Sequence, residues 1–254
     1  MLKNKFDLTG KLALITGSSR GIGEGIALAL AEYGADIIVV YHSDKKEGQE
    51  AVQKIKKLSR KAYLFQSDLS RKNSAQKLHK LLKDKKLLPD ILVVNASVQV
   101  PKKWLDISDQ DFDQQVNTNF RSTLHLFQVF VPEMINKKWG RVLTLGSVQE
   151  QKPHPAMLVY AATKAAVANM VKNLALQLAD QGVTINNLAP GVIGTDRLDE
   201  PVPEVDEKIG NRMTIPMETI GNPPVCAALA LLLCSDAGRY ITGQTYYVDG
   251  GMSL

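Results

Sequence analysis

Thr16-Gly-Ser-Ser-Arg-Gly-Ile-Gly23 is the most informative segment of the sequence. It follows the apolar run Leu12–Thr16, which predicts a buried strand, and precedes a helical pattern from Ile26 to Tyr33 that Gly34 stops. Its three glycines let the chain turn sharply and let backbone N–H groups approach a pyrophosphate at the start of a helix. The spacing is G-x-x-x-G-x-G, not the general G-x-G-x-x-G, so the glycines alone are weak evidence. The strand before them and the helix after them favour a dinucleotide-binding loop at residues 16–23 over an ordinary tight turn.

Short apolar runs alternate with helix-sized segments along the rest of the chain. Further strands are expected at Ile37–Tyr41, Ala62–Gln66, Ile91–Asn95, Arg141–Leu145, Thr184–Leu188 and Thr245–Val248, and a second helix at Gln49–Leu58. Strands that are apolar throughout indicate a parallel sheet covered on both faces. The sequence therefore predicts an α/β fold: a single doubly wound Rossmann-type domain over residues 1–254, with a parallel sheet of about seven strands and helices on both faces. The proline-rich, acidic stretch 194–224 is expected to be a flap over the site, not a domain boundary.

Composition limits the function classes. Apolar residues make up 44% and charged residues 22% of the 254 residues, as in ordinary globular proteins. The net charge of +5 comes largely from lysines that alternate with leucines at helical spacing, as on solvated helix faces, so nucleic-acid binding is not expected. No apolar run approaches the roughly 20 residues of a membrane span. The two cysteines, Cys226 and Cys234, fit a buried helix better than a disulfide or a metal site. A cytoplasmic protein without membrane, nucleic-acid or metal partners is expected.

The end of the second predicted strand bears on the choice of nicotinamide cofactor. An acidic residue about 20 residues past the glycines would hold the ribose 2′-OH of NAD. Tyr41 stands at that place, and Arg20, His42 and Ser43 offer the donors and positive charge that a 2′-phosphate requires. Asp44 is a competing carboxylate. NADP(H) is favoured, with NAD(H) as the alternative.

Tyr160-Ala-Ala-Thr-Lys164 places a phenol and an ammonium four residues apart, on one face of a helix. A phenol with a pKa near 10 is a poor acid or base at neutral pH, and an adjacent ammonium corrects this by stabilising the phenolate. Ser147, just after a predicted strand, is placed to hydrogen-bond a substrate oxygen. A Tyr-x-x-x-Lys pair alone is common on helix surfaces, so its meaning depends on the residues that precede it.

With these residues the chain resembles the short-chain dehydrogenase/reductase family. The matching segments run in family order from one end to the other: Thr16–Gly23, Ser67-Asp-Leu69, Asn95-Ala96, Asn117-Thr-Asn119, Gly146-Ser147, Tyr160–Lys164, Pro190–Thr195 and Val248–Gly251. The resemblance implies an NAD(P)-dependent enzyme that interconverts a secondary alcohol and a carbonyl, and a homotetramer. One departure is Val94-Asn-Ala-Ser97, where the family usually has Asn-Asn-Ala-Gly; it puts a side chain where backbone normally approaches the adenosine.

The resemblance also implies a role for each matching residue. Tyr160 would be the general acid/base, and Lys164 would stabilise its phenolate and bind the nicotinamide ribose. Ser147 would orient the substrate oxygen, and Asn119 would hold a water that links Lys164 to solvent. Asp68 would contact the adenine, Asn95 would brace the sheet, and the turn 190–195 would fix the carboxamide. The full set of expected cofactor residues is Gly17, Ser19, Arg20, Gly21, Ile22, Gly23, Tyr41, His42, Ser43, Asp68, Leu69, Asn95, Ala96, Ser97, Tyr160, Lys164, Pro190, Gly191, Val192 and Thr195.

The substrate is less constrained. The segment 147–160 is similar to the Ser-Val-His-Glu-x-x-Pro-x-Pro segment of bacterial glucose dehydrogenases, and Gln149, Glu150 and His154 would bind the hydroxyls of a sugar or polyol. A polar loop facing water is the alternative interpretation.

Two other functions stay open. The first is reduction of 3-oxoacyl groups on acyl carrier protein. It would need a basic patch at the mouth of the site, to which Lys137 and Lys138 could contribute, but Gln181 stands where such reductases tend to have an arginine. The second is a non-catalytic NADP(H)-binding protein, against which the intact set of Asn119, Ser147, Tyr160 and Lys164 argues.

Overall fold

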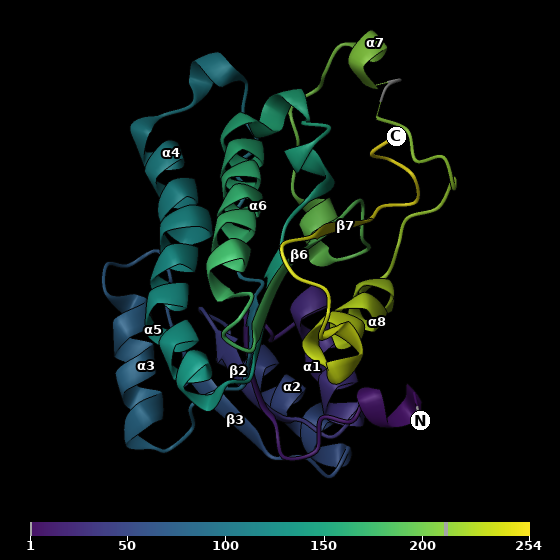
Figure 1. Ribbon diagram of the computed structural model, residues 1–254. Coiled ribbons are helices and arrows are strands. Elements are labelled where there is room, and N and C mark those ends of the chain that lie inside the picture. The colour runs from purple at the N-terminus through teal and green to yellow at the C-terminus, as the bar shows by residue number, and fades with distance from the viewer. Residues whose placement is uncertain (1, 211–212) are drawn as a thin grey trace.

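The computed structural model describes residues 2–210 and 213–254, and its centre is a seven-stranded parallel sheet (Figure 1). The strands are β1 Leu12–Thr16, β2 Asp36–Tyr41, β3 Ala62–Gln66, β4 Ile91–Val94, β5 Gly140–Leu145, β6 Val183–Pro190 and β7 Thr245–Val248. Their order across the sheet is β3-β2-β1-β4-β5-β6-β7, and every neighbouring pair is parallel. The predicted Rossmann-type α/β architecture is confirmed.

Helices cover both faces of the sheet (Figure 1). On one face lie α1 Gly21–Glu32, α2 Lys45–Lys57 and α8 Pro223–Cys234, and on the other α3 Ser74–Asp84, α5 Ser122–Lys137 and α6 Leu158–Leu178. Helix α4, Asp109–Gln115, runs into α5 through the π-helical turn Val116–Arg121, and the short α7 is Glu207–Gly210. No helix in these residues is long and apolar enough to cross a membrane.

The strand pattern explains why there are two cores. Successive strand residues point to opposite faces of a sheet. Ala13 and Ile15 of β1 accordingly pack into the core beneath α1 and α8, and Leu14 packs into the core beneath α3, α5 and α6. All three side chains are fully buried. Both free cysteines are buried in α8, as the sequence predicts.

Two helices begin earlier than the periodicity predicts. Helix α1 begins at Gly21, not near Ile26, because the second half of the glycine-rich stretch is itself the first helical turn. Helix α2 begins at Lys45, because the carboxylate of Asp44 accepts a hydrogen bond from the backbone N–H of Glu47 at 3.0 Å and caps the helix. Asp44 is thus the cap of α2.

The parallel sheet brings the loops of the predicted site to one edge. All seven strands end at the same edge. The chain passes from β1 outward to β2 and β3 on one side and then crosses to β4 on the other side of β1, so a crevice opens between the loops that follow β1 and β4. The predicted flap, residues 194–224, holds the 3-10 turn Asp196–Asp199 and α7, and residues 211 and 212 of that flap lie outside the described residues.

Candidate active site

The glycine-rich loop has a conformation that larger residues would disturb. Gly17 and Gly21 have φ values of +63° and +61°, in the left-handed region that favours glycine. A Cβ on Gly23 would lie 2.4 Å from the carbonyl oxygen of Gly17, closer than any real contact. The loop therefore presents bare backbone at the start of α1. Arg20, the residue before α1, is extended and caps no helix N–H with its side chain, as far as the structure describes the chain.

Asn95 and Thr16 hold this loop against the end of β4. The amide nitrogen of Asn95 donates to the carbonyl oxygens of Thr16 (3.0 Å) and Gly17 (2.9 Å). The hydroxyl of Thr16 accepts hydrogen bonds from the backbone N–H groups of Asn95 and Ala96, both at 3.0 Å. Asn95 thus joins two loops at the sheet edge. Thr16 has an equal share in this bridge, which the motif comparison alone did not assign.

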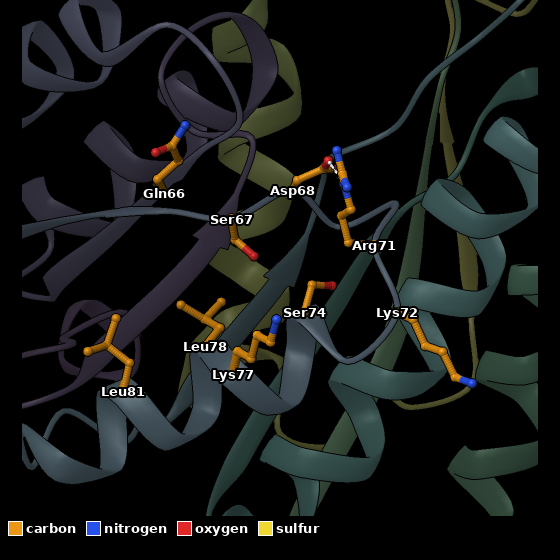
Figure 2. Close-up of a pocket in the computed structure, with 9 residues that line it drawn as sticks. All are labelled: Gln66, Ser67, Asp68, Arg71, Lys72, Ser74, Lys77, Leu78 and Leu81. Atoms are coloured by element: carbon orange, nitrogen blue, oxygen red, sulfur yellow. Dashed lines mark hydrogen bonds and ion pairs between the residues drawn. The ribbon is translucent and has the colours of Figure 1, made fainter.

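A cavity of about 230 Å³ lies beside the glycine loop at the ends of β1, β2, β3 and β4. It contains seven of the predicted cofactor residues: Gly17, Tyr41, His42, Asp68, Leu69, Ala96 and Ser97. A second hollow of about 260 Å³ runs along α3 and shares Ser67 and Asp68 with the first. Figure 2 shows Arg71 turned toward Asp68, and its Nε donates to the carboxylate at 3.0 Å.

Of the predicted 2′-phosphate residues, His42 lines that cavity, and Arg20 stands directly before α1. Arg20 is 3.0 Å from the carboxylate of Glu47 and 3.5 Å from that of Asp196, yet 63% of its side chain is exposed. His42 is 70% exposed, with its Nε2 3.7 Å from Asp68. The two side chains are therefore accessible to an anion, but Arg20 already has acidic neighbours.

The predicted catalytic residues meet at the ends of β5 and α6. Lys164 is only 4% exposed, and its ammonium donates to the carbonyl oxygen of Leu145 at 2.6 Å, two residues before Ser147. The same ammonium lies 5.5 Å from the ring centroid of Tyr160. Burial lowers the pKa of Lys164, while the charges of Tyr160 and Glu150 oppose that shift. The ammonium thus lies beside the phenol ring and against the end of β5, which Ser147 follows, and all three residues are buried.

Asn119 lies in the π-helical turn between α4 and α5 and is 3% exposed. Its side-chain oxygen accepts from the N–H of Val98 at 2.9 Å, and its amide nitrogen donates to the carbonyl of Val98 at 2.9 Å and to the hydroxyl of Thr163 at 3.1 Å. The side chain therefore clamps the loop after β4 to the helix that carries Tyr160 and Lys164. π-Turns of this kind are frequent at functional sites.

The predicted substrate residues divide into two groups. Gln149 and His154 are half-buried near the mouth: Gln149 accepts from the N–H of His154 at 2.8 Å, and His154 Nδ1 accepts from the N–H of Ala156 at 3.2 Å. Burial lowers the pKa of the His154 imidazole, which favours its neutral form. Glu150 turns inward, and both its carboxylate oxygens accept hydrogen bonds from Asn187 of β6. The geometry does not support a direct contact between Glu150 and substrate.

Comparison with known proteins identifies the family. A family model described as Enoyl-(Acyl carrier protein) reductase matches residues 17–253. The chain belongs to the short-chain dehydrogenase/reductase family. It is similar to 3-oxoacyl-[acyl-carrier-protein] reductase of Staphylococcus aureus (strain Mu50 / ATCC 700699), with 33% identity covering 96% of this chain and 98% of the relative. It is equally similar to Glucose 1-dehydrogenase 2 of Bacillus subtilis (strain 168), with 34% identity covering 98% of this chain and 96% of the relative.

A solved structure agrees with this assignment. The 3-oxoacyl (acyl-carrier-protein) reductase of Agrobacterium tumefaciens C58 with NADP bound superimposes with a TM-score of 0.90 at 34% identity, covering 99% of this chain and 97% of that one. This short-chain dehydrogenase/reductase is therefore an oxidoreductase acting on alcohol and carbonyl groups, and the non-catalytic alternative is set aside.

Ser97, where this dehydrogenase departs from the usual family glycine, has a partner that sequence inspection missed. Arg197 donates to the hydroxyl of Ser97 at 3.2 Å and to its carbonyl oxygen at 3.0 Å. Beside this contact, Gln99 donates to the carboxylate of Glu200 at 3.1 Å. The start of the predicted flap is thus joined to the loop after β4. No sequence pattern pairs residues 100 positions apart, so only the fold reveals this contact.

The two lysines considered for a carrier-protein patch lie away from the site of this dehydrogenase. Lys137 ends α5 and Lys138 follows it, directly before β5, so both stand at the edge where the strands begin. Lys137 is also bound to Asp90, at 2.8 Å. The expectation that these lysines flank the mouth is wrong, because α5 runs antiparallel to the strands and ends at the opposite edge of the sheet.

Proposed function

We propose that this short-chain dehydrogenase/reductase is an NADP(H)-preferring enzyme that interconverts a secondary alcohol of a sugar or polyol and the corresponding carbonyl. The observation that carries the proposal is the buried ammonium of Lys164, held by the carbonyl of Leu145 and beside the ring of Tyr160. A cation fixed in this way is placed to stabilise negative charge that develops on a neighbouring group during the reaction.

The three side chains divide the chemistry between them. In the direction of reduction, Ser147 donates a hydrogen bond to the substrate oxygen and Tyr160 transfers its proton to that oxygen. Lys164 stabilises the phenolate that remains, and burial lowers the pKa of its own ammonium. In oxidation the phenolate of Tyr160 accepts the proton instead. Bound NADP(H) supplies or accepts the hydride.

The residues present fit a dinucleotide phosphate. The bare backbone of residues 17–23 and the start of α1 suit the pyrophosphate, since a Cβ at Gly23 would close the loop. The cavity between Gly17, Tyr41 and Ser97 suits the adenosine. Exposed Arg20 and His42 are available to a 2′-phosphate, and one carboxylate oxygen of Asp44 is already used in capping α2. The NADP-bound structural relative supports the same choice.

The preference for a sugar or polyol comes from the segment between Ser147 and Tyr160. Within the described residues, Gln149 accepts a hydrogen bond through Oε1 and His154 through Nδ1. The Nε2 atom of each side chain is therefore left to bind a substrate hydroxyl. We further propose that residues 194–224 act as a flap over this pocket, because Arg197 and Glu200 already contact the loop after β4.

The test is the absorbance change of the reduced nicotinamide with purified protein. NADP⁺ or NAD⁺ is combined with sugars and polyols, and NADPH or NADH with ketoses and acetoacetyl thioesters. Turnover of a sugar or polyol with NADP(H), abolished in Tyr160→Phe while NADPH still binds, is the expected result. Turnover of the thioester alone would show that the enzyme is a 3-oxoacyl reductase and not a sugar or polyol dehydrogenase. Activity that survives in Tyr160→Phe would overturn the mechanism.

We also expect a homotetramer, as the family resemblance implies. Several large apolar side chains are exposed on the single chain, among them Trp104, Leu105 and Leu176. Light scattering after size exclusion should give four times the mass of one chain, and a monomer at micromolar concentration would contradict this.

A further inference from the structure

Glu150 places a carboxylate directly behind Ser147. Its Oε1 accepts a hydrogen bond from the backbone N–H of Ser147 at 2.9 Å, and the amide nitrogen of Asn187 donates to both carboxylate oxygens at 3.0 Å. A Cβ on Gly146 would lie 1.9 Å from Oε1, so the carboxylate fills the space that this glycine leaves. Both carboxylate oxygens of Glu150 are occupied by the protein's own donors.

Asn187 connects this carboxylate to the sheet. In the strand register Asn187 stands opposite Thr144 of β5 on one side and Thr245 of β7 on the other. The hydroxyl of Thr144 donates to the side-chain oxygen of Asn187 at 2.6 Å, and the amide nitrogen of Asn187 lies 3.3 Å from the hydroxyl of Thr245. A polar row therefore crosses β5, β6 and the edge strand β7, and it ends on Glu150. Polar groups in a buried strand need such partners, which makes the row costly to break.

The charges around Glu150 come from several elements. Lys164 and Lys172 of α6 attract its negative charge. Burial, together with the negative charges of Glu150 and Asp249, raises the pKa of the Tyr247 phenol in β7. Burial raises the pKa of the Glu150 carboxyl, and the hydrogen bonds from Asn187 and Ser147 oppose that shift. Conversely, the negative charge of Glu150 acts on Lys164: it raises the pKa of the buried ammonium against the effect of burial and so helps to keep it protonated.

We propose that Glu150 is a positioning residue of the active site: anchored on Asn187, it fixes the backbone of Ser147 so that the serine hydroxyl points at the substrate oxygen, and it balances the charge of Lys164. The inference rests on the proposed function, which assigns the substrate oxygen to Ser147. Glu150 acts through these two residues and not on the substrate. Small errors in such placement are expensive, because a shift of about 1 Å in a reacting group can cost about 100-fold in rate.

The donor pattern provides a sharp test through exchange of the two side chains. In Glu150→Gln the new amide nitrogen faces the amide nitrogen of Asn187, so two donors meet. In Asn187→Asp two carboxylates meet. In the double variant the amide of residue 150 donates to the carboxylate of residue 187, while Ser147 N–H and the Thr144 hydroxyl keep their acceptors. The double variant also keeps the net charge of the pair.

Four proteins and one control are compared with the sugar or thioester that the wild type turns over. We expect kcat to fall by at least about tenfold in each single variant, with the KM for NADP(H) within about twofold of wild type, and to recover to within about threefold of wild type in the double variant. The pH profile of kcat should shift in Glu150→Gln, because Lys164 loses a counter-charge. Glu32→Gln, at an exposed position of α1, is the control and should match wild type.

Melting temperatures give the same test without a substrate. The double variant should be more stable than either single variant, because only it restores matched donors and acceptors. A wild-type kcat in Glu150→Gln, or a double variant no better than the single ones in rate and stability, would overturn the inference. A purely structural role would lower melting temperature but leave the kcat of the folded fraction and its pH profile unchanged. These results are separable from Tyr160→Phe, whose activity tests the proposed function itself.

Discussion

Replacing Asn119 with alanine should weaken both the fold and cofactor binding. Alanine removes the two hydrogen bonds to the backbone of Val98 and the one to Thr163, and leaves the Val98 N–H and carbonyl without these partners. At about 0.5–1.5 kcal/mol for each of three hydrogen bonds, the free energy of unfolding should fall by about 2–3 kcal/mol. For a domain of this size that corresponds to a melting temperature about 5–10 °C lower. Because Val98 lines the adenosine cavity, the dissociation constant for NADPH should rise several-fold.

Calorimetry and a fluorescence titration with NADPH measure the two effects. Asn117→Ala is the matched control: it lies in the same π-helical turn, but its side chain only accepts an exposed hydrogen bond from Arg121, so its cost should stay below about 0.5 kcal/mol. Asn119→Asp should be no better than alanine, since it sets an oxygen against the Val98 carbonyl. If Asn119→Ala lowers kcat alone, with melting temperature and NADPH affinity unchanged, the clamp is refuted and the residue acts only on proton exchange.

Three further predictions follow from local geometry. Gly23→Ala should raise the dissociation constant for NADPH at least about tenfold, because its Cβ would meet the Gly17 carbonyl oxygen at 2.4 Å. Gly210→Ala is the control and should bind NADPH as the wild type does, because a Cβ at Gly210 would have no atom within 4 Å. Equal NADPH binding by the two variants would contradict the loop assignment. The hydrogen bond from Lys102 is the largest of several that lower the pKa of Asp111 from 3.8 to about 2, so its stabilisation is present above pH 4 and lost as the pH falls toward 2. The melting-temperature gap between wild type and Asp111→Asn should therefore narrow over that range, and a constant gap would count against this. Burial raises the thiol pKa values of the two α8 cysteines to about 11 and about 12, so a thiol reagent at pH 8 should label neither in the native protein and both after unfolding; rapid native labelling would show that α8 opens.

The sheet was predictable because strands buried on both faces appear in the sequence as runs of apolar residues. A parallel strand covered on both faces is apolar at most positions, and the strands Leu12–Thr16 and Ala62–Gln66 have the predicted bounds. Helix starts were less visible, because they depend on capping contacts as well as on periodicity. The pair Asp44 and Glu47, three residues apart, could have indicated the start of α2, since a helix often begins after an acidic cap.

The site was predictable only where motif and backbone coincide. The glycine loop and the pair of Tyr160 and Lys164 depend on local spacing, which the sequence contains. Contacts such as Arg197 with Ser97, or Glu150 with Asn187, join distant segments and depend on which way a side chain turns once the strands are in place. A hint of one of them was present: β6 contains two consecutive asparagines in a fully buried strand, and buried amides must find partners.

Polar residues that touch no ligand set the positions of those that do. The loops after β1, β4 and β5 form the site, yet they are too short to build cores of their own, so hydrophobic packing cannot fix them to within a fraction of an ångström. Asn95 ties the first loop to the second, Asn119 ties the second to α6, and Glu150 ties the third to β6. The Asn95 amide donates, the Glu150 carboxylate accepts and the Asn119 side chain does both, so the direction of each tie is specified as well as its distance. It follows that exchanging donors for acceptors at these three positions should disturb catalysis more than a substitution of similar size in either hydrophobic core, where the neighbours can repack.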